Sequence, residues 1–164
     1  GADLDSIRFG LDRFEGVKDR AELVAEIDGV LFVNDTSATA PAAAIAALDA
    51  YPGRKLHVIA GGFDKQLPLD ALGRALAEKA ATIILLDGTA TPRLMEEIRG
   101  AGGSWIGPFD SMRKAVDAGA QIASGGDVVL LSPGCASFGL FRDEFDRGDK
   151  FRESVAHLKE TTGA

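Results

Sequence analysis

Short apolar runs alternate along the chain with longer segments whose apolar residues recur at helical spacing. The runs VLFVN, LHVIAGG, TIILLDG and VVLLSPG are almost wholly apolar, which is typical of parallel strands covered on both faces. Strands and helices that alternate in this way indicate βαβ units. The pattern therefore predicts an α/β fold, a Rossmann-like three-layer sandwich of about six mostly parallel strands with helices on both faces. The strands are expected at residues 22–28, 30–34, 55–60, 82–87, 104–107 and 127–132.

Helices are expected between the strands, because large apolar residues recur there three or four positions apart. We expect the helices at 41–51, 69–80, 91–100 and 111–124, and a last amphipathic helix that contains Phe151, Val155 and Leu158. Thr91 is the expected N-cap of the third of these helices, with Pro92 at its first position. Asp110 or Ser111 is expected to cap the fourth helix.

The charge balance narrows the class of protein. The chain has 18 lysines and arginines against 25 aspartates and glutamates, a formal net charge of −7. No stretch gathers the basic residues, which disfavours binding to nucleic acid or to an anionic membrane. One cysteine and two histidines leave no disulfide framework and no Cys-rich zinc site. No apolar run approaches the roughly 20 residues that span a bilayer, so we expect a cytoplasmic protein without membrane insertion.

The length and the apolar pattern together predict the domain organisation. A chain of 164 residues fits a single domain. The strand and helix pattern occupies residues 16–164. Ile7, Leu11 and Phe14 predict a short helix that stands apart from this pattern. We therefore expect residues 1–15 to be the tail of a preceding central domain or a linker.

Three polar segments follow predicted strands, at the edge where open parallel sheets bind ligands. The first, residues 34–41, combines Asp35 with the hydroxyls of Thr36, Ser37 and Thr39 at the start of a predicted helix. Free backbone N–H groups at a helix start favour anions. One hydroxyl would be enough to cap the helix, so capping remains an alternative explanation of this segment.

The other two polar segments follow the third and the last predicted strand. In GGFDK, at 61–65, paired glycines allow close approach of the backbone, and Lys65 can neutralise a carboxylate or a phosphate. A turn with a solvated lysine is the alternative. In LSPGCASF, at 131–138, Ser137 is expected near the start of the next helix, where it could hold a carboxylate. Cys135 is expected to be packed rather than nucleophilic. A P-loop is absent from the chain.

These segments resemble the C-terminal domain of the Mur ligases, and within that family the glutamate-adding branch. The resemblance rests on FVNDTSAT, on GGFDK and on LLSPGCASFGLFRDEFDRGDKF, the last of which is similar to the family signature SPACASFDMF…RGDKF. It covers residues 16–158. The DNPR motif of the diaminopimelate- or lysine-adding relatives is missing. The chain departs from the family pattern at Ser37, where a lysine is usual, and at GGFDK, where GGDGK is usual.

The resemblance implies an ADP-forming amide ligase of peptidoglycan synthesis, which adds D-glutamate to UDP-N-acetylmuramoyl-L-alanine through an acyl phosphate. It implies that this domain positions glutamate and closes over ATP. The P-loop, the Mg²⁺ ligands and the UDP site are implied to lie in the central and N-terminal domains of the same chain, so the fragment alone is expected to be inactive. The alternatives are a homologue that adds L-glutamate and a stand-alone Rossmann-like module that binds a nucleotide or metabolite.

The resemblance also assigns roles to individual residues, none of them catalytic and none a metal ligand. The residues implied to hold the glutamate carboxylates are Thr39, Lys65, Ser137 and the backbone at Phe138. The residues implied to contact ATP are Arg20 and Asp35, the latter at the ribose. Two neighbouring positions are further candidates, Ser37 and Asp64.

Overall fold

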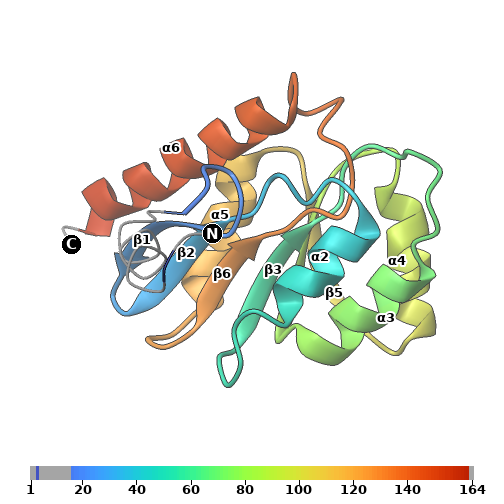
Figure 1. Cartoon of the computed structure of the whole chain (residues 1–164), viewed down its shortest axis with the longest axis horizontal. Helices are drawn as coiled ribbons and strands as arrows, with labels where there is room; N and C mark the ends of the chain where they lie inside the picture. Colours follow the sequence, from blue (N-terminus) through green and yellow to red (C-terminus); the bar gives the residue numbers. More distant parts are fainter. Residues whose placement is uncertain (1–2, 4–15, 163–164) are drawn as a thin grey trace.

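The computed structural model describes residue 3 and residues 16–162 of the chain. The described part forms six strands and five helices (Figure 1). In chain order they are β1 (Glu22–Ile27), β2 (Val30–Asn34), α2 (Pro41–Leu48), β3 (Leu56–Ala60), α3 (Asp70–Lys79), β4 (Thr82–Leu86), α4 (Thr91–Gly100), β5 (Trp105–Phe109), α5 (Met112–Ile122), β6 (Val128–Leu131) and α6 (Glu144–Thr162). The helix predicted around Ile7, Leu11 and Phe14 lies outside the described residues, as does the linker at 1–15 apart from residue 3.

The strands of the described part form one sheet in the order β1-β2-β6-β3-β4-β5. β1 is antiparallel to β2, and the other neighbours are parallel. Asp28 and Gly29 make this reversal in two residues, both with positive φ (51° and 78°), as a tight hairpin turn requires. The predicted α/β fold with a mostly parallel sheet is confirmed, and each predicted strand is present with its ends shifted by two residues at most.

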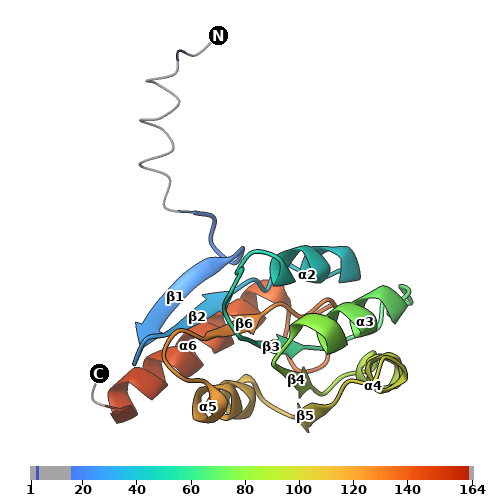
Figure 2. The ribbon, with the colours of Figure 1, turned by 90° about the horizontal axis from the view of Figure 1, so that it is seen from below.

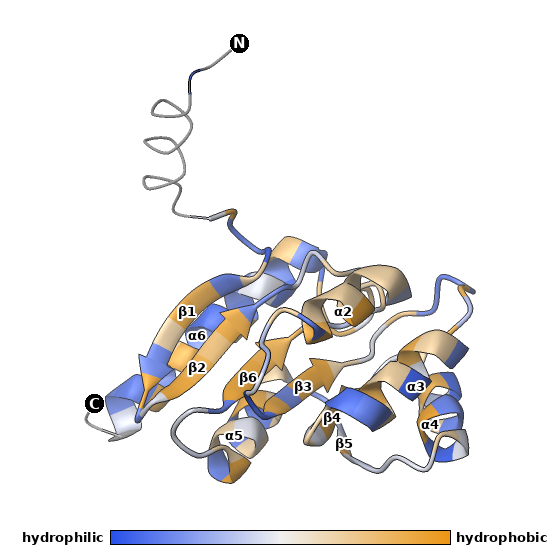
Figure 3. Ribbon diagram, turned by 60° about the horizontal axis from the view of Figure 1, so that its bottom comes forward, coloured by the Kyte–Doolittle hydropathy of each residue, from blue (hydrophilic) through white to orange (hydrophobic). Residues whose placement is uncertain are grey.

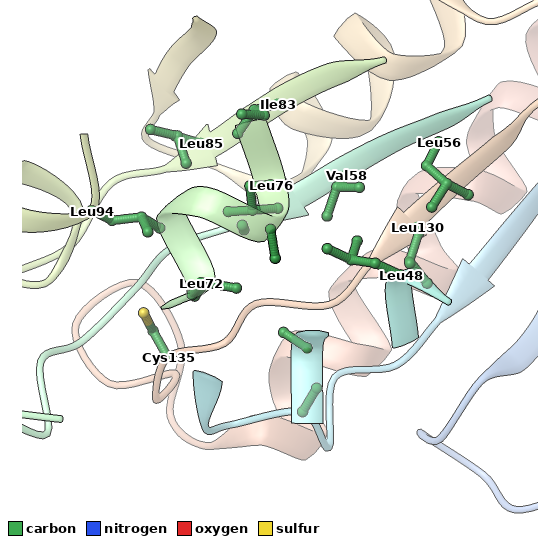
Figure 4. Close-up of a cluster of buried hydrophobic side chains, with 14 of the residues drawn as sticks. Leu48, Leu56, Val58, Leu72, Leu76, Ile83, Leu85, Leu94, Leu130 and Cys135 are labelled. Atoms are coloured by element: carbon green, nitrogen blue, oxygen red, sulfur yellow. The ribbon is translucent and has the colours of Figure 1, made fainter. Parts of the chain in front are cut away.

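Helices cover both faces of the sheet and create two cores. Figure 2 shows α2 and α3 on one side of the strands and α5 and α6 on the other. Leu72 and Leu76 of α3 pack with Val58 in the first core, part of which is shown in Figure 4. Phe151 of α6 packs with Ile59 in the second. Neighbouring residues of β3 thus face opposite cores, which is why the strands are apolar along most of their length (Figure 3).

Two helix starts test the predicted caps. Ser111 is the N-cap of α5, and its hydroxyl accepts a hydrogen bond from Lys114 N at 3.4 Å. The prediction for Thr91 is wrong, because the N-cap of α4 is Ala90 and no side chain caps that helix. Thr91 is already helical, and its hydroxyl donates instead to the carbonyl oxygen of Leu86 at the end of β4, at 2.7 Å.

The topology brings the polar segments to one edge of the sheet. The loops at 35–40, 61–69 and 132–143 leave the carboxyl ends of β2, β3 and β6, which lie side by side as parallel neighbours. Because β1 is antiparallel, Glu22 at its start pairs with Asn34 at the end of β2. Arg20 therefore comes to the same edge, which we call the carboxyl edge.

The search for membrane spans was confined to the described residues. Within them, no helix is both long enough and apolar enough to cross a bilayer.

Candidate functional site

Backbone hydrogen bonds join the three candidate loops at the carboxyl edge. Gly134 N donates to Ala38 O at 2.9 Å, which links the loop after β6 to the loop after β2. Phe63 N donates to Ala136 O at 2.8 Å, and Ala136 N donates back to Phe63 O at 3.2 Å. The loop after β6 therefore lies between the other two, and the three loops form one continuous surface.

Glycine makes this close approach of the loops feasible. Gly61 and Gly62 have φ values of 99° and 136°, a region that residues with a Cβ rarely adopt. A Cβ on Gly62 would collide with the carbonyl oxygen of Ala136. The predicted close approach is therefore confirmed, and the approaching group is the loop after β6.

Lys65 and Thr39 meet at the carboxyl edge. Lys65 Nζ donates to Thr39 Oγ1 at 3.3 Å, and the lysine is exposed while the threonine is half-buried. The alternative that Thr36, Ser37 or Thr39 caps α2 is wrong, because the N-cap is Ala40 and no side chain caps the helix. An ammonium beside a hydroxyl offers a charged and a neutral donor, a combination that suits a carboxylate.

Ser137 and Phe138 lie on the same surface but differ in exposure. Ser137 is buried, whereas Phe138 is 53% exposed. The Phe138 ring packs edge-on against Phe63, with ring centroids 5.7 Å apart. The expectation that Ser137 lies near a helix start is wrong, because α6 begins only at Glu144. A turn intervenes, in which Phe141 N donates to Ser137 O at 3.3 Å.

Asp35 and Arg20 form a second group on this edge. Asp35 is buried, and its carboxylate accepts hydrogen bonds from Ser132 Oγ at 2.9 Å and from Ala21 N at 3.2 Å. Burial raises the pKa of the Asp35 carboxyl above its usual range, while these hydrogen bonds and the charge of Arg20 oppose that shift. Arg20 is exposed, so its guanidinium is accessible to a ligand at this end of the edge.

The turn that carries Arg20 is fixed to α6 by ion pairs. Arg152 donates to Asp19 at 2.9 Å, to Glu22 at 2.6 Å and to Asp149 at 2.6 Å. Asn34 Nδ2 donates to the same Asp19 and Glu22 oxygens, at 3.0 and 3.1 Å. Only 3% of the Asp19 side chain is exposed, so the network places this turn against the end of β2.

The two further candidates have other contacts. Ser37 is half-buried, and its backbone N–H donates to Asp19 O at 3.0 Å. Asp64 accepts a hydrogen bond from Arg93 Nη1 at 2.7 Å. The Arg93 guanidinium holds the pKa of the Asp64 carboxyl below its usual range.

Arg147 of α6 has a role at this edge that sequence reasoning missed. It is fully buried. Its Nε donates to Thr36 Oγ1 at 2.9 Å, its Nη2 to Thr36 O at 2.9 Å and its Nη1 to Cys135 O at 3.1 Å. Burial lowers the pKa of Arg147 to about 10, so it remains charged at neutral pH. In the sequence, Arg147 belongs to the RGDKF run. That run indicated a resemblance to a family but did not indicate that the arginine joins two loops.

The Cys135 thiol is part of the core. It lies beside Leu72 at the edge of the first hydrophobic cluster (Figure 4), and burial raises its pKa to about 11. A thiol that is protonated and shielded at neutral pH is a poor nucleophile, in agreement with the expected packing role. Among residues 3 and 16–162, no group of three or more His, Cys, Asp or Glu side chains is arranged to hold a metal ion.

The fold and this surface define the class of protein. It is an α/β domain that presents a cation, hydroxyls and a buried carboxylate at the carboxyl edge of a parallel sheet, where such folds bind ligands. Residues 19–135 match the family model described as "Mur ligase, glutamate ligase domain". The chain belongs to the Mur ligase family.

Similar proteins include two bacterial ligases. The UDP-N-acetylmuramoylalanine-D-glutamate ligase of Roseiflexus sp. (strain RS-1) is 53% identical over 157 residues, which cover 94% of this chain and 34% of that protein. The ligase of the same name from Symbiobacterium thermophilum is 42% identical over 161 residues, 96% of this chain and 34% of that protein. The chain thus spans about a third of the length of these curated relatives.

Solved structures share the fold at low sequence identity. The UDP-N-acetylmuramate-alanine ligase of Thermotoga maritima aligns with a TM-score of 0.70 and 16% identity, over 98% of this chain and 34% of that chain. A bifunctional folylpolyglutamate synthase/dihydrofolate synthase of Yersinia pestis aligns with a TM-score of 0.59 and 18% identity, over 100% of this chain and 35% of that chain. Both likenesses support the architecture described above.

Burial of Cys135 predicts slow alkylation of the folded protein. The thiolate is the reactive form, and a pKa raised from 9.0 to about 11 leaves roughly 100-fold less of it near pH 8, since each pKa unit is a factor of ten. We expect iodoacetamide to modify Cys135 at least about 100-fold more slowly in buffer than in urea, measured by mass spectrometry. Equal rates would contradict the burial of this thiol.

Replacement of Arg147 by lysine should destabilise the fold. A single ammonium cannot reach the acceptors on both loops, and hydrogen bonds to charged groups contribute about 1.5–3 kcal/mol each. We expect Arg147→Lys to lower the free energy of unfolding by about 2–4 kcal/mol in urea titration. The control is Arg142→Lys on an 84% exposed side chain, for which a change below about 0.5 kcal/mol is expected. Equal effects in the two variants would argue against the proposed contacts.

Proposed function

We propose that this chain is the glutamate-binding, C-terminal domain of a larger ATP-dependent ligase, which adds D-glutamate to UDP-N-acetylmuramoyl-L-alanine in peptidoglycan synthesis. The observation that carries the proposal is the Lys65–Thr39 pair at the carboxyl edge, in a chain whose relatives are named D-glutamate ligases. Residues 16–164 would form this domain and residues 1–15 the tail of the preceding domain or a linker.

Four residues of the three joined loops would hold glutamate. Lys65 supplies the charge for one carboxylate, and the Thr39 hydroxyl adds a hydrogen bond beside it. Ser137 and the backbone at Phe138 would hold the other carboxylate. The hydrogen bonds between the loops support this division, because they fix the distance between the two groups before glutamate arrives.

Arg20 and Asp35 would contact the nucleotide. A carboxylate oxygen of Asp35 could accept a hydrogen bond from a ribose hydroxyl in addition to the hydrogen bonds that the side chain already receives. Arg20 is exposed and forms no ion pair within residues 16–162, so its guanidinium is available to a phosphate. A solved protein of this fold, from Yersinia pestis, is complexed with AMPPNP and a manganese ion, which supports a nucleotide with a divalent cation as the co-substrate.

The contribution of this chain to catalysis would be positioning. ATP, with Mg²⁺, supplies the activation of the carboxylate that is to be joined. The residues above would orient the amino group of glutamate toward that carboxylate, and pre-orientation of two reactants can contribute up to about 7–11 kcal/mol to lowering the barrier. We infer that the N-terminal UDP-binding domain and the central ATPase domain, with the P-loop and the Mg²⁺ ligands, form the remainder of the enzyme in the cytoplasm.

The proposal predicts a stereospecific product. The complete ligase, assayed with UDP-N-acetylmuramoyl-L-alanine, ATP and either D- or L-glutamate, should release ADP and form the amide with D-glutamate. Formation of product with L-glutamate alone would favour the L-glutamate-adding homologue. Tight nucleotide binding by this chain alone in calorimetry, without ligase activity of the complete protein, would favour the stand-alone module.

Replacement of Lys65 by alanine should weaken glutamate binding. Loss of a charged hydrogen bond costs about 1.5–3 kcal/mol, so we expect the KM for glutamate in the complete ligase to rise by about 10- to 100-fold. The KM for ATP should change little. The matched control is Lys114→Ala, since Lys114 pairs with Asp110 at the start of α5 and should leave both constants unchanged. An unchanged KM for glutamate in Lys65→Ala would contradict the assignment of this glutamate site.

A further inference from the structure

The loop after β3 places an acid next to the cation of the proposed glutamate site. Asp64 directly precedes Lys65. A free carboxylate at this position would offset the charge of Lys65 and repel the carboxylates of an acidic ligand. The environment of Asp64 therefore affects how strongly Lys65 can attract glutamate.

Both carboxylate oxygens of Asp64 are directed to partners other than Lys65. Oδ1 accepts a hydrogen bond from Gln66 N at 2.6 Å, and Oδ2 accepts one from Arg93 Nη1 at 2.7 Å. Gln66 has a φ of 59°, which folds the chain back in a tight turn. Lys65 lies within this turn, and its Nζ donates to the Thr39 hydroxyl.

Arg93 reaches this turn from a different element. It lies in the first turn of α4, and besides Asp64 it contacts Leu67 O, through Nη2 at 3.3 Å. It therefore binds the chain on both sides of Lys65. The pair is accessible, with 47% of the Arg93 side chain and 20% of the Asp64 side chain exposed. Exposed ion pairs add little to stability, so the main effect of this pair is on the local charge.

We propose that Arg93 is a positioning residue for the amino-acid site, which neutralises Asp64 and so leaves Lys65 as the charge that a glutamate carboxylate meets. This inference rests on the proposed function. With Arg93 the three side chains carry one net positive charge, and without it they carry none. Arg93 is not itself expected to touch glutamate.

The charged side chains of Asp64, Lys65 and Arg93 lie close together. Asp64, Lys65 and Cys135 line the same small cavity, together with Leu67. The charges of Asp64, Lys65 and Arg93 also act on the buried Cys135 thiol. A ligand carboxylate near Lys65 would therefore interact electrostatically with all three charged side chains.

The test compares three variants of the complete ligase, Arg93→Gln, Asp64→Asn and the double variant. Arg93→Gln should raise the KM for glutamate about tenfold, the size of effect expected from one uncompensated charge within several ångströms of the ligand at a protein surface. Its kcat and its KM for ATP should stay within about twofold of wild type. The double variant should recover most of the loss, because the repelling carboxylate is gone. Asp64→Asn alone should bind glutamate at least as well as wild type.

The matched control is Arg99→Gln, on the same helix, where Arg99 lies over the Trp105 ring. It should leave the KM for glutamate unchanged. An unchanged KM in Arg93→Gln would overturn the inference, and so would a double variant as weak as Arg93→Gln, because a purely structural contact would not be rescued by removal of the acid. The variant Lys65→Ala distinguishes a failure of this inference from a failure of the proposed function. If Lys65→Ala raises the KM for glutamate and Arg93→Gln does not, only the inference about Arg93 fails. If neither variant changes the KM for glutamate, the proposed glutamate site fails.

Discussion

A buried guanidinium holds the carboxyl edge of this sheet together. Arg147 has no exposed surface, and an isolated charge in such a place is expensive unless each of its donors finds an acceptor. Its acceptors are the hydroxyl and carbonyl of Thr36 and the carbonyl of Cys135. Because these belong to the loops after β2 and β6, the charge can be buried only when both loops take their observed positions against α6. A misplaced loop would leave the buried charge without acceptors, so the guanidinium fixes the positions of both loops.

The proposed binding residues depend on this arrangement to different degrees. Asp35 and Ser137 lie one and two positions from the Arg147 acceptors, on backbone that the guanidinium fixes directly. Lys65 is connected less directly, through the hydrogen bonds between Phe63 and Ala136, and its side chain is exposed. The site thus combines fixed hydroxyls and backbone with one long cation, so that the ligand needs to order only a single side chain on binding.

The fold could be predicted from the sequence because its signal is local. VLFVN and VVLLSPG are almost wholly apolar, as is typical of strands covered on both faces, and the structure confirms a strand in each. Thr91 was misplaced because a cap depends on where the turn after β4 closes, which one residue type does not determine. Arg147 and Arg93 were missed for a different reason. Their partners, Thr36 and Asp64, are far away in sequence, so the contacts exist only once the sheet has brought the loops together.

The acidic composition of the chain makes the arginines that pair with acids near the proposed site more important. A domain with a net charge of −7 creates a field that disfavours an acidic amino acid and a nucleotide, since both are anions. Near the proposed binding residues, however, three acids are paired with arginines: Arg152 forms ion pairs with Asp19 and Glu22, and Arg93 forms one with Asp64. Asp35 is instead buried and hydrogen-bonded to a hydroxyl, and its proposed partner is a neutral ribose. The local charge around Lys65 and Arg20 is therefore set by these pairs, which act over a few ångströms, rather than by the overall field, which salt screens over about 8–10 Å.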